Sequence, residues 1–245
     1  MSISKGQNTN APPLGFISVD VDIERPVGDP FNEATWPFPL LKELAEGSQL
    51  NNIVTSETYP EEFLAGIVSA GEKLQQKGCV GIITDCGFLA GAQRELAMRL
   101  SIPIAASALA QIPSIQAFLR PGQTVGALTY DDSKLGVRQL LQVGVHDPDA
   151  VYIAAPPEDG WLRGHIRDGV PYDHAKIETE LVESALGLLR RHPDIGAILL
   201  ECTQMPPFAD AIRKATNLPV YDVYTLGTWF YSALTSQRPQ HWGPI

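Results

Sequence analysis

Two segments of the chain share one pattern, Gly81-Ile82-Ile83-Thr84-Asp85-Cys86 and Gly196-Ala197-Ile198-Leu199-Leu200-Glu201-Cys202. In each segment a short apolar run headed by glycine ends in an acidic residue and a cysteine. A proline follows each cysteine by 17 positions, at Pro103 and Pro219, so both residue pairs differ by the same 116 positions (202 − 86 and 219 − 103). This constant offset predicts an internal duplication in which each half contributes one cysteine at an equivalent place.

The sequence around these segments has the pattern of an α/β protein. Short apolar stretches alternate with stretches in which apolar residues recur at helical spacing, which predicts mainly parallel sheets flanked by helices. The chain has 245 residues, enough for two units with a core each, and the duplication favours two. We expect the second strand at Ile53-Val54-Thr55, a helix capped by Ser107, and another capped by Asp132 or Ser133.

Two irregular stretches separate these elements. Residues 26–39 form a long series of turn formers and aromatics after the first strand, where loops often carry function. Arg25, Asn32 and Thr35 are candidates to face a ligand there; a surface loop that covers the core is the alternative. Residues 156–172 are rich in Pro, Gly and charge, which indicates an irregular connection or lid, or a solvated loop. Residues 1–12 and the segment from Gln237 are expected to be terminal tails on the surface.

Composition and charge exclude several classes of partner. The net charge is −10 and no cluster of Lys or Arg occurs, which argues against nucleic acid, since its phosphates are bound by basic side chains. No tract is apolar enough over the length of a bilayer, so we expect no membrane insertion. Three cysteines cannot form a disulfide framework, and the polar first residues lack the apolar core of a signal peptide. These features predict a reducing, cytoplasmic setting.

The two cysteines of the repeated segments are the candidate catalytic residues. Both follow predicted strands directly, and in parallel sheets ligands bind beyond the carboxyl ends of strands, near helix N-termini. A helix N-terminus favours a thiolate and lowers the thiol pKa, whereas Asp85 and Glu201, if close, would oppose it. Thiols on opposite faces of a substrate suit removal of a proton from one face of a carbon acid and its return to the other. Two buried structural cysteines are the alternative reading, which is also our reading of Cys79.

Other catalytic schemes find less support in the sequence. The five histidines have no metal-ligand spacing, and no Gly-rich phosphate or dinucleotide fingerprint follows the first strand. A cysteine nucleophile activated by a distant histidine remains an alternative, for which His165 lies in a suitable stretch. We therefore expect neither a metal nor an organic cofactor.

The segment Cys202-Thr203-Gln204-Met205-Pro206 is similar to the Cys-Thr-His-Tyr-Pro segment of glutamate racemases. In layout nearly the whole chain resembles the aspartate/glutamate racemase superfamily, which also includes hydantoin racemases, maleate isomerases and arylmalonate decarboxylases. The first cysteine motif, Cys86-Gly87-Phe88, departs from the Cys-Asn-Thr of the amino-acid racemases, which weakens free aspartate or glutamate as the substrate.

The resemblance implies an architecture and an activity. It implies two pseudo-symmetric α/β lobes with the active site in the cleft between them. Residues 1–107, completed by 221–245, form the first lobe, and residues 108–220 form the second. It implies a cofactor-independent racemase or epimerase acting next to a carboxylate or carbonyl, on a small carboxylate or cyclic amide. A homodimer is implied by the resemblance alone. Cys86 and Cys202 are the expected acid and base, and the expected substrate-binding residues are Asn32, Gly87, Phe88, Thr129, Thr203 and Gln204.

Two other readings stay open at this point. One is a decarboxylase or cis–trans isomerase of the same superfamily; the decarboxylases usually use one cysteine, in the second half. The other is a small-molecule-binding protein that has kept the cleft without catalysis. Thiol reactivity separates the binding protein from the enzymes, because a binding protein does not need a cysteine with a lowered pKa.

Overall fold

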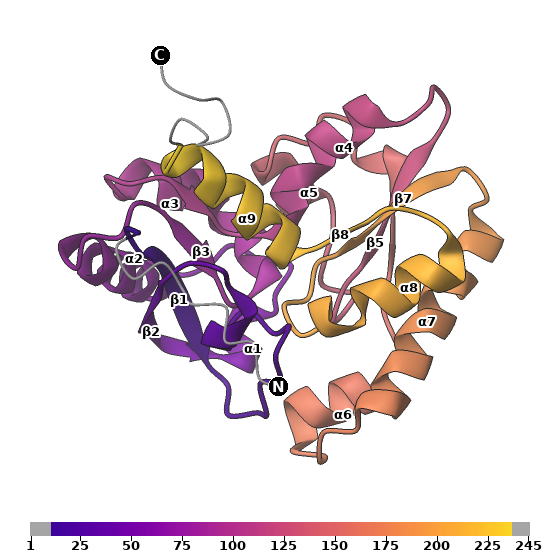
Figure 1. Ribbon diagram of the computed structural model, residues 1–245, viewed down its shortest axis with the longest axis horizontal. Helices are drawn as coiled ribbons and strands as arrows, with labels where there is room; N and C mark the ends of the chain where they lie inside the picture. The colour runs from indigo at the N-terminus through magenta and orange to yellow at the C-terminus, as the bar shows by residue number, and fades with distance from the viewer. Residues whose placement is uncertain (1–10, 237–245) are drawn as a thin grey trace, which may run out of the picture.

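The computed structural model describes residues 11–236 and shows two lobes side by side (Figure 1). Each lobe contains a four-stranded, fully parallel sheet, in the order β2-β1-β3-β4 in the first and β6-β5-β7-β8 in the second. The predicted class, an α/β fold with two lobes and parallel sheets, is confirmed. The strands are β1 (Leu14–Asp20), β2 (Leu40–Gln49), β3 (Ile82–Thr84), β4 (Ile104–Ala105), β5 (Thr124–Leu128), β6 (Val151–Ala154), β7 (Ile195–Leu200) and β8 (Val220–Tyr221).

The sheet register shows the internal duplication directly. In the first sheet Ile82 of β3 pairs with Ile104 of β4, and in the second Ile198 of β7 pairs with Val220 of β8. Both members of the pair are displaced by 116 positions (198 − 82 and 220 − 104), the offset already found between the cysteines. The two halves therefore place Cys86 and Cys202 at corresponding ends of corresponding strands.

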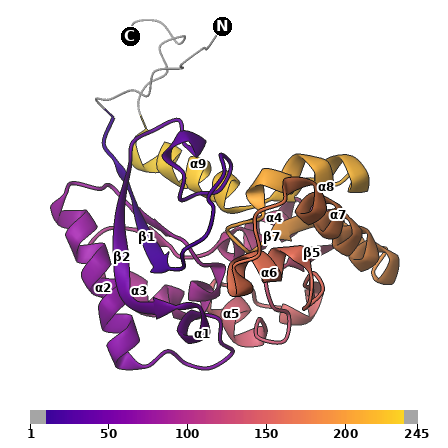
Figure 2. The same cartoon turned by 90° about the horizontal axis from the view of Figure 1, so that it is seen from below.

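Helices cover the sheets of both lobes. Figure 2 shows α2 and α3 on the side of the first lobe and α6, α7 and α8 on the side of the second. The α-helices are α1 (Leu50–Ile53), α2 (Glu61–Gln76), α3 (Gln93–Arg99), α4 (Ile112–Phe118), α5 (Val137–Gln142), α6 (Trp161–Asp168), α7 (His174–Arg191), α8 (Ala209–Thr216) and α9 (Val223–Leu234). Short 3-10 helices are η1 (Glu33–Thr35), η2 (Gly87–Ala92), η3 (Ala108–Gln111), η4 (Pro148–Ala150) and η5 (Pro206–Phe208).

The last helix returns to the first lobe. Successive residues of a strand point to opposite faces, so Ile17 joins the core beneath α2 while Phe16 joins a second cluster, which also contains Trp36 and Leu226 of α9. Gly227 allows this approach, because a Cβ there would lie 2.6 Å from the Trp36 ring. The division of the chain at residues 107 and 221 stays a prediction, and the expected tails at 1–10 and from Gln237 lie outside the described residues.

The predicted second strand at 53–55 is wrong. Ile53 ends the single turn of α1, and the backbone N–H of Val54 donates to the Leu50 carbonyl. The strand that pairs with β1 is β2, whose sequence Leu-Leu-Lys-Glu-Leu-Ala-Glu-Gly-Ser-Gln favours a helix in isolation. Pairing along β1 at the edge of the sheet outweighs that local preference, as tertiary context often does for strands.

The stretch 156–172 is also more ordered than predicted. It contains α6, whose first free N–H groups, at Trp161 and Leu162, donate to the carboxylate of Glu180 at 2.6 and 3.1 Å. Gly169, at φ 69°, ends the helix in the left-handed conformation that glycine adopts without strain. The cap comes from a helix 18 positions or more away, so local composition did not indicate it.

Of the two helix N-caps predicted from the sequence, the structure confirms one and contradicts the other. Ser107 accepts a hydrogen bond from the Leu109 N–H and begins η3, as expected. Neither Asp132 nor Ser133 caps α5, which follows Gly136 instead; the Gln139 side chain satisfies the Gly136 N–H. Between residues 11 and 236, no helix combines the length and apolar character needed to cross a membrane.

Candidate active site

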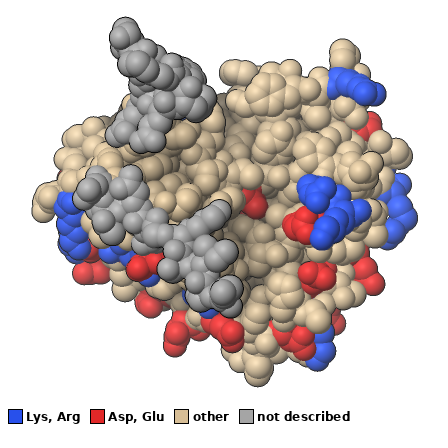
Figure 3. Space-filling view, in the orientation of Figure 1, with Lys and Arg blue, Asp and Glu red and all other residues tan. Residues whose placement is uncertain are grey.

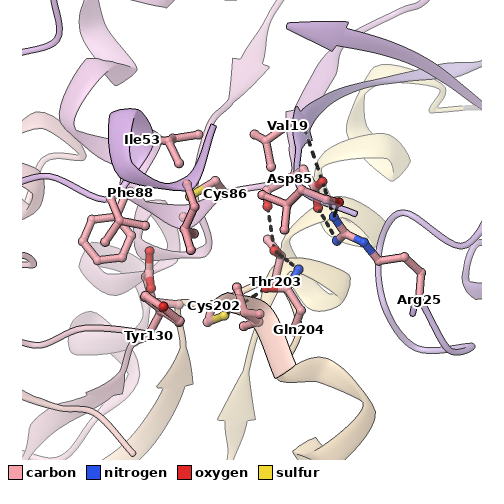
Figure 4. A pocket seen from close by; sticks show the side chains of 16 residues that line it. Val19, Arg25, Ile53, Asp85, Cys86, Phe88, Tyr130, Cys202, Thr203 and Gln204 are labelled. Atoms are coloured by element: carbon pink, nitrogen blue, oxygen red, sulfur yellow. Dashed lines mark hydrogen bonds and ion pairs between the residues drawn. The ribbon is translucent and has the colours of Figure 1, made fainter. Parts of the chain in front are cut away.

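Cys86 and Cys202 line one pocket between the lobes. Each lies two residues beyond the end of its strand, β3 or β7, and Cys86 precedes the first turn of η2. The surface sinks between the two lobes, with acidic atoms at its centre (Figure 3). Figure 4 shows the two cysteines approaching from different lobes, with Phe88 and Tyr130 on one side of them and the Arg25–Asp85 pair on the other. The duplication thus brings both thiols to a single small-molecule site.

Six of the eight predicted site residues line this pocket: Cys86, Gly87, Phe88, Cys202, Thr203 and Gln204. The other two stand behind it. Asn32 caps η1 by accepting from the Ala34 N–H, and its amide donates to the Arg25 carbonyl at 2.9 Å. Thr129 is fully buried and donates its hydroxyl to the Glu201 carboxylate at 2.7 Å. Both side chains position residues of the pocket, while a direct contact of either with substrate stays a prediction.

Thr203 and Gln204 form a short hydrogen-bonded chain across the lobes. The Thr203 hydroxyl donates to the Asp85 carbonyl oxygen at 2.7 Å and accepts from the Gln204 side-chain amide at 3.1 Å. The Gln204 carbonyl oxygen accepts from the Cys202 thiol, with Sγ and Oε1 3.2 Å apart. The segment after Cys202 is thereby tied to the residue before Cys86, which fixes the two thiols relative to each other.

A buried ion pair forms one side of the pocket. The Arg25 guanidinium donates to both carboxylate oxygens of Asp85, at 2.9 and 3.0 Å, and to Asp29 at 3.4 Å. The Asp85 side chain is fully buried and burial raises its pKa to about 7, although the Arg25 charge acts in the opposite direction. Arg25 was one of three loop candidates in the sequence, whereas nothing local indicated Asp85 as its partner, 60 positions away.

Glu201 is the second buried carboxyl of the pocket and was missed as a site residue. One oxygen, Oε2, accepts from the Thr129 hydroxyl, while Oε1 is buried and has no hydrogen-bond partner among the described residues. Burial raises the pKa of Glu201 to about 7. The signal that could have found it was present in the repeated pattern, where an acidic residue precedes each cysteine.

Both thiols have raised pKa values, contrary to the expectation from their position at helix N-termini. Burial is the largest cause for both Cys86 and Cys202, and the charge of Glu201 is the second. The backbone N–H groups of Phe88 and Gln204 act in the expected direction and lower the thiol pKa values. Two N–H groups are outweighed because loss of water and a neighbouring carboxylate both penalise a thiolate. Resting thiols are therefore protonated at neutral pH.

Within residues 11–236 no group of three or more His, Cys, Asp or Glu side chains could hold a metal ion. His165, the histidine considered as an activator, lies in α6 and does not line the pocket of the cysteines. Its Nδ1 atom lies 2.9 Å from the Val170 carbonyl oxygen. His165 is therefore not among the charged groups that act on the thiols, which are Glu201, Asp85, Asp29 and Arg25.

Comparison with known proteins assigns the family. No family model matches the chain. A dimethylsulfoniopropionate lyase from Durusdinium sp. clade D is 30% identical over 230 residues, which cover 92% of this chain and 76% of the relative. The chain belongs to the dimethylsulfoniopropionate lyase family. Dimethylsulfoniopropionate lyase 7 from Emiliania huxleyi is 27% identical over 91% of this chain and 67% of its own length, and this chain spans 57% of lyase 6 from the same organism.

Several solved structures of other enzymes share the fold of this chain. Arylmalonate decarboxylase has a TM-score of 0.57 at 14% identity, covering 94% of each chain. A glutamate racemase from Bacillus anthracis has a TM-score of 0.59 at 16% identity, covering 96% of this chain and 84% of the racemase. Allantoin racemase from Klebsiella pneumoniae has a TM-score of 0.58 at 13% identity, covering 91% and 87%. The predicted resemblance to the aspartate/glutamate racemase superfamily is confirmed at the level of the fold.

The predicted racemase or epimerase activity is wrong, and with it the isomerase class. The curated relatives are named as dimethylsulfoniopropionate lyases, not as isomerases. The error has a chemical reason. Two thiols beside a pocket indicate removal of a proton from a carbon acid, but they do not indicate whether the resulting carbanion is reprotonated or expels a leaving group.

Gly87 packs directly against Glu201 of the other half, and its replacement is expected to lower the stability of the protein. A Cβ at Gly87 would lie 2.3 Å from Glu201 Oε1 and 2.4 Å from the Glu201 carbonyl oxygen. We expect Gly87→Ala to displace Glu201 or η2 and to reduce the free energy of unfolding by about 1–3 kcal/mol, measured by urea denaturation. Gly136→Ala is a suitable control, because a Cβ there meets nothing within 4 Å; equal losses in the two variants would contradict the close approach.

The raised carboxyl pKa of Glu201 predicts a pH-dependent contribution to stability. A carboxyl whose pKa is higher when folded binds more protons in the folded state, so its contribution falls as pH rises from the ordinary value of 4.5 towards about 7. Between pH 5 and pH 8 wild type should lose more free energy of unfolding than Glu201→Gln, by on the order of 1–3 kcal/mol. Urea denaturation at both pH values measures this. The same loss in both proteins would show that Glu201 keeps an ordinary pKa.

Proposed function

We propose that the chain is a lyase that cleaves dimethylsulfoniopropionate to acrylate and dimethyl sulfide. The observation that carries the proposal is the 30% identity to a dimethylsulfoniopropionate lyase over 92% of this chain. The two thiols that line one pocket supply chemistry of the required kind. The activity of the relatives and the geometry of the site therefore support the same reaction.

The reaction follows from the structure of the substrate. Dimethylsulfoniopropionate carries a carboxylate and, on the second carbon away from it, a positively charged dimethylsulfonium group. A base removes a proton from the carbon next to the carboxylate, the electron pair of that C–H bond forms the double bond of acrylate, and the C–S bond breaks. Dimethyl sulfide leaves as a neutral molecule that needs no proton. Elimination thus shares its first step with racemisation but requires a single base.

Cys202 is the better candidate for that base. Burial and Glu201 raise the pKa of both thiols, and at Cys202 the charge of Arg25 opposes part of the further increase caused by Asp29, whereas no positive group is among the main influences on Cys86. Burial favours the protonated thiol, but a sulfonium cation that enters the pocket favours the thiolate. The substrate therefore assists formation of its own base. Cys86 faces the same pocket from the other lobe and restricts the orientation of the substrate between the two thiols.

The carboxylate end of the substrate fits the side of the pocket that holds Thr203 and Gln204. The Gln204 amide has two N–H groups, of which one donates to the Thr203 hydroxyl. The amide also hydrogen-bonds to the Asp29 side chain, and a substrate carboxylate can take the place of Asp29 as acceptor, so that this N–H stabilises charge that develops as the proton leaves. These contacts support substrate-binding roles for Thr203 and Gln204 at one end of the pocket.

Product formation tests the proposal directly. The purified full chain is incubated with dimethylsulfoniopropionate, dimethyl sulfide is measured in the headspace by gas chromatography, and acrylate is measured by proton NMR. Equal amounts of both products, formed at a rate proportional to the protein concentration, are expected. Release no faster than in buffer alone, from protein that is folded by circular dichroism, would overturn the proposal.

A further inference from the structure

The acidic residues that precede the two cysteines have the same place in each half but different partners. Asp85 and Glu201 are displaced by the 116 positions of the duplication (201 − 85). Asp85 receives two hydrogen bonds from Arg25, a cation supplied by the chain itself. Glu201 is 1% exposed, and its carboxyl accepts hydrogen bonds from the Thr129 hydroxyl and the Tyr130 backbone N–H, neither of which is charged. The acidic residue of the second half therefore has no counterpart of Arg25, the cation that balances the acidic residue of the first half.

Glu201 is a wall residue of the pocket, and its Oε1 atom is buried beside Gly87. Glu201 lines the pocket together with both thiols, and its Oε1 atom has no hydrogen-bond partner in the part of the chain that the structure describes. A buried carboxylate without a positive partner is costly. Arg163, whose guanidinium lies 5.4 Å from the Tyr130 ring centre, has its ion-pair partners in Asp131 and Asp132. No ion pair joins Glu201 to a cation within residues 11–236, so a ligand in the pocket can supply the positive charge that its carboxylate lacks.

The walls near this end suit a cation that carries methyl groups. Phe88 and Tyr130 lie on the same side of the pocket, away from the Arg25–Asp85 pair (Figure 4). Their side chains are 1% and 8% exposed. Aromatic rings bind onium groups through both their π faces and their apolar surface, whereas a strongly hydrated ammonium such as that of lysine would lose its water here. A sulfonium or quaternary ammonium group matches these walls.

We infer that Glu201, with Phe88 and Tyr130, forms the subsite for the onium group of the substrate, so that the ligand supplies to the second half the positive charge that Arg25 supplies to the first. The inference rests on the proposed function for the identity of the substrate, and it orients the substrate with its sulfonium at Phe88 and Tyr130 and its carboxylate at Gln204. When the positive sulfonium balances the negative charge of Glu201, the Glu201 carboxylate no longer opposes formation of the Cys202 thiolate.

Binding of two unreactive probes tests the subsite without requiring turnover. One probe is the trimethylammonium analogue of the substrate, whose amine is a poor leaving group. The other is its neutral tert-butyl isostere, in which carbon replaces nitrogen. Isothermal titration calorimetry on wild type should show about tenfold or greater preference for the cation, and Glu201→Gln should bind the two probes within about twofold of each other. Glu62→Gln, the same change on the exposed face of α2, should keep the wild-type preference.

The pH dependence of wild type provides a test that needs no variant. The preference for the cation should increase as pH rises through the pKa of Glu201, about 7. Asp85 titrates in the same range, and burial also raises the pKa of Asp29, so pH dependence that persists in Glu201→Gln is assigned to these two carboxyls. Cys86, Cys202 and Tyr59, which also influence or respond to Glu201, have raised pKa values and stay protonated in this window.

The outcomes separate this inference from the proposed function. A cation preference that is lost in Glu201→Gln supports the subsite even if no dimethyl sulfide is released, a result that would overturn the lyase proposal alone. Release of dimethyl sulfide by wild type, together with an unchanged cation preference in Glu201→Gln, would overturn the subsite and leave the lyase proposal standing. Equal binding of both probes to wild type at pH 8 would also overturn the subsite.

Discussion

Replacing Cys202 with serine is expected to lower kcat for release of dimethyl sulfide by about 10²–10⁴-fold, the usual contribution of a positioned general base. A serine hydroxyl fills nearly the same space as the thiol but does not ionise near neutral pH, so the variant binds substrate without removing its proton. KM should change much less than kcat, because the interactions of the carboxylate and the sulfonium are retained. Initial rates measured by headspace gas chromatography over a range of substrate concentrations separate the two constants.

The chain offers a matched control for this change. Cys79 is buried in the core of the first lobe, outside the pocket, so Cys79→Ser makes the same atomic change away from the site and should keep wild-type activity. Cys86→Ser should lower kcat less than Cys202→Ser. If Cys86→Ser abolishes the reaction and Cys202→Ser does not, the base has been assigned to the wrong lobe.

Replacing Arg25 with methionine is expected to cost about 3–5 kcal/mol of the free energy of unfolding, because it leaves a buried carboxylate without its counter-ion. The Asp85 side chain is 0% exposed and loses both of its guanidinium hydrogen bonds. Without Arg25 its pKa rises further above the ordinary value, so the folded variant takes up a proton. The loss should therefore be larger at pH 8 than at pH 5, as measured by urea denaturation at both pH values.

Arg99→Met is the matched control at the surface. Arg99 pairs with Glu61 and Glu95 at the surface, where water and salt screen the charges, so its ion pairs are expected to contribute little to the free energy of unfolding. The double variant Arg25→Met with Asp85→Asn should recover part of the loss, since an amide needs no counter-ion. Equal destabilisation by Arg25→Met and Arg99→Met would contradict a structural role for the buried pair.

The larger features of the fold could be predicted because they depend on patterns of neighbouring residues that are repeated along the chain. Apolar strands, helical periodicity and the offset of 116 positions identified two similar α/β halves with a cysteine at the end of one strand in each. The same reasoning failed at β2 and α6. β2 is formed by helix-favouring residues that pair along β1, and α6 begins at a carboxylate supplied by α7. Both elements depend on partners distant in sequence.

The candidate site divides in the same way. Cys86, Gly87, Phe88, Cys202, Thr203 and Gln204 stand next to the repeated pattern and were selected from it, and they line one pocket. The partners Arg25 with Asp85 and Thr129 with Glu201 are 60 and 72 positions apart, and no local pattern joins them. The direction of the thiol pKa shifts also depended on burial, which is a property of the assembled pocket.

The sequence by itself determined the duplicated α/β architecture and the placement of one thiol at a strand end in each half, because strands, helices and strand ends follow from the periodicity of neighbouring residues. Only the tertiary structure decided which charges the pocket contains and how they are balanced. Asp85 is paired with Arg25 and Glu201 is left with a free oxygen because burial and long-range contacts set the energy of a charge, and neither exists until the two lobes have come together.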